Sequence, residues 1–349
     1  MNFKSDNCAG AHPKITENLA ANASGFAASY GASDVDRRAE EMFCDLFGRQ
    51  VAVFFVGTGT AANALAMTAV NRPGGVVFCH PQAHIFEDEC GAPEYFTGGA
   101  RLAGVDGAFG RMDPDGLVEA IGRHPADFVH NGQPMAVSIT QSTEIGTLYA
   151  PGDIDAISTI GRKNGLPLHM DGARFANALV ALDLTPAAMT VERGVDIVSF
   201  GGTKNGCWCA EALVFLDPDM AADVPFLRKR AAHLFSKSRF IAAQFEAYLA
   251  DGLWLELARH SNAMATALAE GLAASSNCRL AWQPEANEVF PVIKRQTAAR
   301  LVDAGAEFHE WPMPSFGGEK LGDDEMLCRL VTSFATTEED VARFCEIAG

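Results

Sequence analysis

The sequence lacks the features by which several classes of protein are recognised. Its longest apolar stretches are far shorter than a membrane span, and the opening residues, MNFKSDNCAGAHPK, contain no apolar signal core. The nine cysteines are an odd number and are scattered singly, except for Cys207 and Cys209, so neither a disulfide framework nor a CxxC metal pair is visible. We therefore expect a cytoplasmic protein whose cysteines act as small buried hydrophobic side chains.

Positive charge is also scarce. The chain has 27 Lys and Arg against 44 Asp and Glu, a formal net charge of -17, and no cluster of basic residues forms a local patch. Such a surface repels phosphate backbones, so nucleic acid is not an expected partner. In contrast, 48% of the 349 residues are hydrophobic and only 20% are charged, which is enough to bury a large core in one big domain plus a smaller one.

Short β-rich runs alternate with helical stretches through the first two thirds of the chain. Near-continuous apolar runs of strand length occupy residues 51–56, 75–80, 135–140, 166–171, 195–200 and 212–216. Strands of this kind have both faces buried. Helices are predicted at 34–47 with Ser33 as N-cap, at 59–70, and at 150–165 with Gly165 as the stop. The alternation predicts an α/β fold, a mostly parallel sheet covered by helices on both faces.

The pattern changes after residue 217. A long helical region, roughly 221–275, precedes a smaller α/β unit with strands predicted at 288–293, 306–311 and 326–334 and helices at 296–304 and after Thr337. We place the boundary within the helical region, which gives a large domain over 1–240, with the N-terminal segment, and a small C-terminal α/β domain over 241–349.

Three features follow predicted strands and should meet in one crevice, because ligands bind outside the carboxyl ends of parallel strands. Asp171 ends the run LPLHMD, Lys204 follows VDIVSFGGT, and the stretch VGTGTAAN at 56–63 opens a helix. Taken singly, Lys204 fits a solvated loop lysine and VGTGTAAN fits an ordinary capped helix. Together they match the three contacts of pyridoxal 5'-phosphate: a carboxylate for the pyridine nitrogen, a lysine for the Schiff base, and donors for the phosphate.

An ordered set of motifs extends the match to nearly the whole chain. KSDN, YGASD (30–34), TGTAAN (58–63), QAHIFEDECGAPE (82–94), HMDGAR (169–174), GGTKNG (201–206) and CRLVTSF (328–334) together resemble the low-specificity L-threonine aldolases. These belong to the β-eliminating lyase group of fold-type I pyridoxal phosphate enzymes. The resemblance implies a mostly parallel seven-stranded-type sheet flanked by helices and a smaller C-terminal α/β domain.

The resemblance also implies roles for individual residues. Lys204 would bind the cofactor covalently, Asp171 would pair with the pyridinium nitrogen, and His84 would stack on the ring and act as an acid or base. Gly59 and Thr60 match the phosphate-binding turn. Arg174 would contact the hydroxyl side of the ring and the substrate carboxylate. Ser5 and Arg329 would bind the same carboxylate. Tyr30 would lie near the active site of a neighbouring subunit.

Two places depart from the family pattern. Many members carry a histidine where this chain has Glu144, in QSTEIG. Glu144 is therefore assigned either a contact with the substrate β-hydroxyl, direct or through water, or a purely structural place in the crevice. A glycine-rich GGGMRQ stretch of some members is replaced by AAHLFSKSRFIAAQ, where Lys237 is available to replace its arginine as a phosphate contact across a subunit interface.

The implied reaction is a retro-aldol cleavage of a β-hydroxy-α-amino acid, such as L-threonine, L-allo-threonine or phenylserine, to glycine and an aldehyde. A first alternative keeps the cofactor and changes the reaction to β-elimination, racemisation or transamination. A second is a metal-dependent hydrolase built on His80, His84, Glu87 and His169 with Asp171, although Pro81 and the preceding strand do not favour two ligands on one helix face. By the same resemblance we expect a homodimer or homotetramer with shared active sites.

Overall fold

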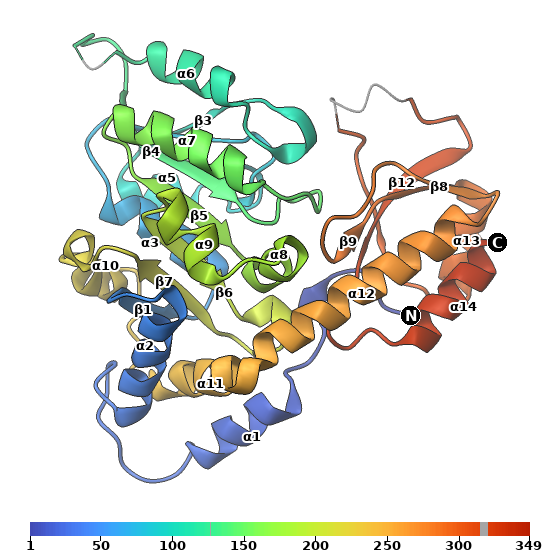
Figure 1. Cartoon of the computed structure of the whole chain (residues 1–349), viewed down its shortest axis with the longest axis horizontal. Coiled ribbons are helices and arrows are strands. Elements are labelled where there is room, and N and C mark those ends of the chain that lie inside the picture. Colours follow the sequence, from blue (N-terminus) through green and yellow to red (C-terminus); the bar gives the residue numbers. More distant parts are fainter. Residues whose placement is uncertain (126, 315–319) are drawn as a thin grey trace.

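A seven-stranded sheet forms the centre of the larger part of the molecule (Figure 1). The computed structural model describes residues 1–125, 127–314 and 320–349. The strand order is β1-β7-β6-β5-β4-β2-β3; β7 runs antiparallel to β1 and β6, and the other neighbouring strands are parallel. The strands are β1 Ala52–Val56, β2 Gly75–Cys79, β3 Arg101–Gly104, β4 Gln133–Thr140, β5 Leu168–Gly172, β6 Ile197–Gly201 and β7 Glu211–Phe215. The predicted, mostly parallel sheet is confirmed.

Helices cover both faces of this sheet, as the apolar strands require, because every residue of β2, β5, β6 and β7 is buried. One face packs against α2, α7 and α8, and the other against α3 and α10. The helices of this part are α1 Pro13–Ala21, α2 Asp34–Phe47, α3 Gly59–Ala69, α4 His84–Glu87, α5 Ala92–Thr97, α6 Pro114–Gly122, α7 Pro151–Lys163, α8 Phe175–Leu182, α9 Pro186–Met189, α10 Val224–Arg230 and α11 Arg239–Leu249.

The helix predicted at 34–47 is confirmed as α2, and the helix predicted at 150–165 is α7, which spans Pro151–Lys163. Ser33 caps α2 through a reciprocal capping box with Asp36, in which each side chain accepts from the other's backbone N–H. Gly165 follows α7 with φ +67, the left-handed conformation that terminates helices.

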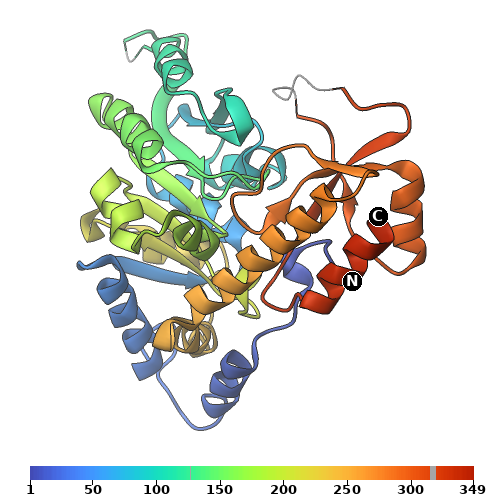
Figure 2. The same cartoon turned by 45° about the vertical axis from the view of Figure 1, so that its right-hand side comes forward.

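A second, antiparallel sheet lies beside the first part, and the 21-residue helix α12 (Leu253–Ala273) runs between the two (Figures 1 and 2). Its strand order is β11-β12-β10-β8, with β9 paired to β12. The elements are β8 Cys278–Leu280, β9 Glu288–Val289, β10 Pro291–Lys294, α13 Arg295–Asp303, β11 His309–Glu310, β12 Glu325–Val331 and α14 Glu338–Ala348.

The N-terminal segment crosses from this second sheet to the first part. Phe3 packs fully buried in the second core, where the N–H of Val331 donates to its carbonyl oxygen at 2.9 Å. The 3-10 turn Asp6–Cys8 then enters the region between the two sheets, and α1 packs on α11. Both chain ends lie beside the second sheet (Figure 1).

Several sequence expectations need correction. The strand predicted at 288–293 is two short strands, β9 and β10, separated at Phe290; the next residue, Pro291, has no N–H to donate to the ladder with β12. The strand predicted at 306–311 is reduced to β11 at His309–Glu310 and an isolated bridge between Glu307 and Asn2, and β3 was not predicted. Cys8 and Cys90 are exposed, although cysteines were expected to be buried. Within the described ranges, no helix is both long and apolar enough to cross a bilayer.

Candidate active site

The carboxyl ends of β1, β5 and β6 open onto a cavity of about 260 Å³. The predicted residues Gly59, Thr60, His84, Asp171 and Lys204 all line this cavity. Its other lining residues are Asn7, Gly57, Thr58, Asn63, Ala173, Thr203 and Glu211. The three strand ends that the sequence analysis expected to converge therefore do so, and we call this space the inner cavity.

Asp171 lies on β5 with only 3% of its surface exposed. The backbone N–H of Ala173 donates to its Oδ1 at 3.0 Å, and the side-chain amide of Asn63 donates to its Oδ2 at 2.7 Å. Both carboxylate oxygens thus accept hydrogen bonds, which fix the orientation of the group.

Asn63 links Asp171 to a second acid. Its amide also donates to Oε1 of Glu89 at 2.8 Å, and the same oxygen lies 3.0 Å from Nδ1 of His84. The hydrogen bond that the His84 ring donates to Glu89 raises the pKa of His84, although burial opposes the effect. Burial in turn raises the pKa of Glu89, opposed by its bonds to His84 and Asn63. Asp171, Asn63, Glu89 and His84 therefore form one continuous polar chain along the inner cavity.

The N-terminus of α3 forms another wall. Thr58 is the N-cap, and its hydroxyl accepts from the N–H of Ala61 at 3.2 Å. The N–H groups at the start of a helix have no intrahelical acceptor, so those of Gly59 and Thr60 are free to bind an anion. A Cβ added to Gly59 would meet no atom within 4 Å, so the backbone leaves room for a close approach.

Lys204 sits in the short 3-10 turn Thr203–Asn205 that follows β6. Two hydrogen bonds hold the turn in place: the side chain of Asn205 donates to the hydroxyl of Tyr248 at 2.7 Å and to the carbonyl of Trp254 at 2.8 Å. Glu211, paired with Gly201 in the sheet, also lines the cavity. Burial raises the pKa of Glu211 to about 7, while hydrogen bonds from Thr203 and the charge of Lys204 oppose the rise.

A second cavity of about 310 Å³ adjoins the first and shares Asn7, His84 and Lys204 with it. We call it the outer cavity. It brings together the remaining predicted residues Ser5, Glu144, Arg174 and Arg329. Asp88, His309, Glu310 and Trp311 complete its lining. Because the two cavities meet at Lys204 and His84, a group bound in one is in reach of a group bound in the other.

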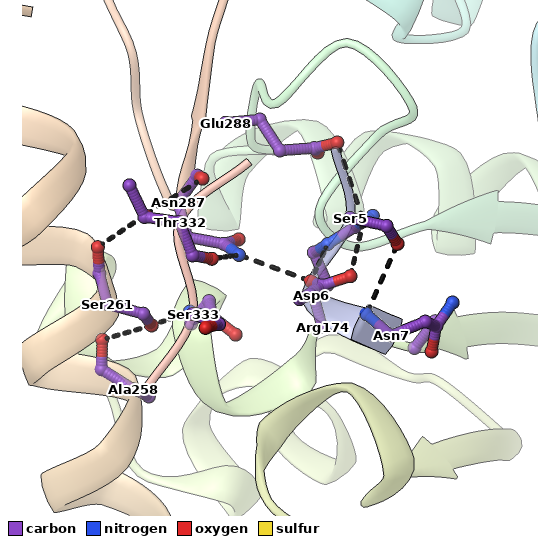
Figure 3. Close-up of polar contacts among 12 residues, drawn as sticks. Ser5, Asp6, Asn7, Arg174, Ala258, Ser261, Asn287, Glu288, Thr332 and Ser333 are labelled. Carbon is purple, nitrogen blue, oxygen red and sulfur yellow. Dashed lines mark hydrogen bonds and ion pairs between the residues drawn. The ribbon is translucent and has the colours of Figure 1, made fainter. Parts of the chain in front are cut away.

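Arg174, at the start of α8, is 4% exposed and tied to the N-terminal turn (Figure 3). Its Nε and Nη2 donate to the two oxygens of Asp6, at 2.7 and 3.2 Å, and Nη2 lies 3.5 Å from Oε1 of Glu288. Burial would raise the pKa of Asp6, but Arg174 and Lys204 hold it below its usual value. A guanidinium with several donors can keep this pairing and still contact a further anion.

The same network reaches the second sheet. The amide of Asn287 donates to Oδ2 of Asp6 at 3.2 Å and to the carbonyl of Thr332 at 2.8 Å, and the Thr332 hydroxyl donates to the carbonyl of Ser261 on α12 at 2.7 Å (Figure 3).

Arg329 lies on β12, and its guanidinium carbon is 4.5 Å from the centre of the Trp311 ring. Its Nε is buried without a hydrogen-bond partner among the described residues, so it retains a donor for a ligand.

Two predicted residues lie outside both cavities. Tyr30 is 51% exposed, with its ring 5.4 Å from Nζ of Lys229, and Lys237 is also exposed. Neither lines the inner or the outer cavity. Within one chain, therefore, neither reaches the other candidate residues.

The residues of the metal alternative are not brought together as a ligand set. His80 contacts the carbonyl of Gly107 at 3.2 Å, and Glu87 is exposed. His169 lies between the hydroxyls of Ser138 and Ser199, at 2.9 Å from each, and burial lowers its pKa to about 4. Among the described residues, no group of three or more His, Cys, Asp and Glu is placed to hold a metal ion.

Sequence reasoning missed several residues of the site. Asn63, Glu89, Glu211, Asp6 and Glu288 are all buried polar side chains at the cavities or in their supporting network. Asn63 and Glu89 lie inside the motifs that carried the resemblance, so their position in TGTAAN and QAHIFEDECGAPE was the available signal. Glu211 and Glu288 gave a weaker sequence signal, because each is an acidic residue within an apolar run of strand length.

The residues present fit pyridoxal phosphate. The open space at Gly59 and the free N–H groups of α3 suit a phosphate, the fixed carboxylate of Asp171 suits a protonated ring nitrogen, and Lys204 supplies an amine between the cavities. His84, held by Glu89, provides an aromatic ring on the same wall.

Comparison with known proteins gives a consistent result. The family model described as beta-eliminating lyase matches residues 2–296. The low-specificity L-threonine aldolase of Pseudomonas aeruginosa is 37% identical over 338 residues, covering 97% of this chain and 95% of the relative. That of a Pseudomonas species is 38% identical and covers 88% of both chains. The solved threonine aldolase of Leishmania major, 31% identical, superposes with a TM-score of 0.91 over 99% of this chain and 98% of its own.

Proposed function

Because this chain belongs to the beta-eliminating lyase family, we propose that it cleaves β-hydroxy-α-amino acids, L-threonine and L-allo-threonine among them, to glycine and an aldehyde. Phenylserine is a further substrate of the same chemical class. The enzyme is thus an aldehyde-lyase of the threonine aldolase type. The observation that carries the proposal is the position of Lys204 where the inner cavity meets the outer one.

The inner cavity would hold pyridoxal 5'-phosphate, which supplies an electron sink for the bond cleavage at the substrate Cα. Lys204 would bind it covalently, and Gly59 and Thr60 would bind the phosphate at the start of α3. Asp171 would hold a proton at the pyridine nitrogen, a role supported by its two fixed hydrogen bonds. His84 would stack on the ring.

The outer cavity would hold the substrate. Arg174 and Arg329 would bind its carboxylate from opposite parts of the molecule, with Ser5 as a further donor, an arrangement suited to bidentate recognition. The β-hydroxyl would then face the acid–base groups of the shared wall.

A base must remove the β-hydroxyl proton as the Cα–Cβ bond breaks. His84 is the better placed candidate, because it lines both cavities and its pKa is raised by Glu89. Glu144, 9% exposed in the outer cavity, would contact the hydroxyl directly or through water. His84 would then accept the proton, and Glu144 would orient the β-hydroxyl.

The function is tested by incubating the purified protein with L-threonine or L-allo-threonine and pyridoxal phosphate. We expect glycine and acetaldehyde in equal amounts, the latter read by a coupled alcohol dehydrogenase. Ammonia with 2-oxobutanoate would instead establish β-elimination, and D-allo-threonine from L-threonine, or D-threonine from L-allo-threonine, would establish racemisation.

Lys204→Ala should fold, because Lys204 lies in a turn at the cavity wall outside the apolar core, yet it should lose both turnover and the cofactor adduct that borohydride traps. Lys163→Ala, at an exposed lysine on α7, is the control and should retain both. A trapped adduct of unchanged yield in Lys204→Ala, located by peptide mapping at another lysine, would refute the assignment.

The active protein is proposed to be a homo-oligomer whose sites are shared between subunits. Exposed aromatic side chains support this: Phe26, Tyr30, Trp208 and Phe235 are between 39% and 110% exposed. Hydrogen bonds join the Tyr30 loop to the loop before α11, from Tyr30 N–H to the carbonyl of Ser236 and from Gly31 N–H to the hydroxyl of Ser238. A second copy of this chain would cover this surface. Tyr30 would then reach the active site of that copy, and Lys237 would reach the phosphate of the cofactor bound there.

We also propose that the protein is cytoplasmic. All nine cysteines are free, which fits a reducing compartment.

A further inference from the structure

Glu288 is a completely buried acid that lies beside Arg174, one of the two arginines lining the outer cavity. It lies on β9, and Nη2 of Arg174 is 3.5 Å from its Oε1 (Figure 3). Neither of its carboxylate oxygens has a hydrogen-bond partner among the described residues. A buried carboxylate without hydrogen bonds is costly, so its charge depends on the two guanidinium groups around it.

Four charged groups from four different elements act on Glu288. They are Arg174 at the start of α8, Arg329 on β12, Glu144 in the loop after β4, and Asp6 in the N-terminal turn. The loop of Glu144 is packed directly against β9, since a Cβ on Gly146 would come within 2.9 Å of the Glu288 Cβ. With Glu288 ionised, these five groups carry one net negative charge. The arginines that should bind a substrate carboxylate therefore already face a surplus of acid.

We propose that Glu288 balances Arg174 and Arg329 while the outer cavity lacks a substrate, and that it takes up a proton when a substrate carboxylate binds between them. This proposal rests on the proposed function, which assigns the carboxylate to these arginines. Glu288 does not touch the reacting atoms. It is a positioning residue that acts through the two guanidinium groups.

The titration of Glu288 supports this exchange. Burial raises its pKa to about 7, against the opposing effects of Arg174 and Arg329, while Glu144 and Asp6 add to the rise. Both protonation states are therefore populated near neutral pH in the free enzyme. A second anion beside the same arginines favours the neutral form further. Binding then consumes a proton above neutral pH, and carboxylate affinity should fall about tenfold per pH unit as pH rises through that range.

The test is isothermal titration calorimetry of the holoenzyme with 3-hydroxybutyrate, which has the carboxylate and the β-hydroxyl but no amine to react with the cofactor. Titrations near pH 8 in two buffers of different ionisation enthalpy give the number of protons taken up. Wild type should take up about one proton. Glu288→Gln should take up almost none and should bind about tenfold more tightly near pH 8, with equal affinity near pH 6.

Glu310→Gln is the matched control, because Glu310 lines the same cavity but is exposed and paired with Arg295 at 3.2 Å. It should take up as many protons as wild type. Glycine, titrated in the same way, should show the same difference of about one proton between wild type and Glu288→Gln. If Glu288→Gln does not fold, the wild type alone decides, because its uptake should vanish well below pH 7.

Equal proton counts for wild type and Glu288→Gln with both ligands, or no uptake by wild type near pH 8, would overturn the proposal. Failure of the proposed function looks different. Threonine would then release neither glycine nor acetaldehyde, whatever the proton count on ligand binding.

Discussion

Glu89 should control the protonation of His84 more directly than any other residue. Its carboxylate oxygen lies 3.0 Å from Nδ1 of His84 and raises the pKa of that ring. Glu89→Gln keeps a hydrogen-bonding group of the same shape but removes the charge, so the pKa of His84 should fall. The measurement is an NMR titration of the His84 ring C–H signal.

The sign of the stability effect follows from the raised pKa of His84. The stabilisation that Glu89 contributes through the protonated ring should be fully present below about pH 6.5 and lost as pH rises through the pKa of the folded protein. Glu87→Gln, two residues away but exposed on α4, should leave the titration unchanged. An unchanged His84 titration in Glu89→Gln would show that the two side chains do not share a proton.

Single residues show the limit of reading this site from sequence. Lys204, Asp171 and His84 follow strand ends in recognisable motifs, and the structure brings them to one cavity. Asn63, by contrast, joins Asp171 at a sequence separation of 108 residues, and Arg174 joins Asp6 at 168. Such partners depend on how the sheet and the N-terminal segment are arranged in space, and no local pattern contains that information.

At the scale of an element, a substitution in the first turn of α3 should change the stability of the protein and its affinity for the cofactor in opposite directions. Gly59→Ala places a methyl group where no atom lies within 4 Å, so it should not strain the apo protein and should stabilise it by about 0.4–1 kcal/mol. The same methyl group would fill the proposed phosphate cradle, so cofactor affinity should fall. Chemical denaturation of the apo protein and fluorescence titration with pyridoxal phosphate measure the two effects.

Gly152→Ala provides the comparison. Gly152 is likewise in the first turn of a helix, α7, and has nothing within 4 Å of an added Cβ, but it lies away from both cavities. It should show the gain in stability without the loss of affinity. If both variants bind the cofactor as wild type does, the start of α3 is not the phosphate site.

Elements with local signals were predicted well. The central strands are continuous apolar runs, and α2 is bounded by its cap at Ser33. The second sheet was predicted less well, because its strands are short and are interrupted by packing between distant parts. The ring of Phe290, between β9 and β10, packs with Ile145, which belongs to the loop after β4. A strand of two residues, such as β11, is also too short for any periodicity to show.

For the whole molecule, the shared-site proposal predicts complementation between two inactive variants. Tyr30→Ala and Lys204→Ala each damage a different part of a composite site, so a hybrid dimer contains one site with neither defect. Mixing the two proteins under conditions of subunit exchange should restore up to about a quarter of wild-type activity. Activity assays before and after exchange measure the recovery.

Mixing Lys204→Ala with Asp171→Asn is the control, because both residues line the same cavity of one chain. Every hybrid site then carries a defect and no activity should return. Light scattering that finds a fully active monomer at assay concentration would contradict the shared site.

The sequence predicted the order of the large and small parts, and the boundary near residue 240 stays a prediction. What it did not predict is how the N-terminal segment joins them. Phe3 packs in the second core, and Asp6 pairs with Arg174 of the first part. These contacts form between residues far apart in the chain, so composition and periodicity carry no trace of them.

Trp311 gives the site an optical reporter. The guanidinium carbon of Arg329 lies 4.5 Å from the centre of its ring, and the chain has only four tryptophans. A cation at this distance shifts the energy of the indole excited state. When Arg329 turns toward a bound carboxylate, the emission wavelength of Trp311 should change, so ligand arrival can be followed in real time by stopped-flow fluorescence without any label.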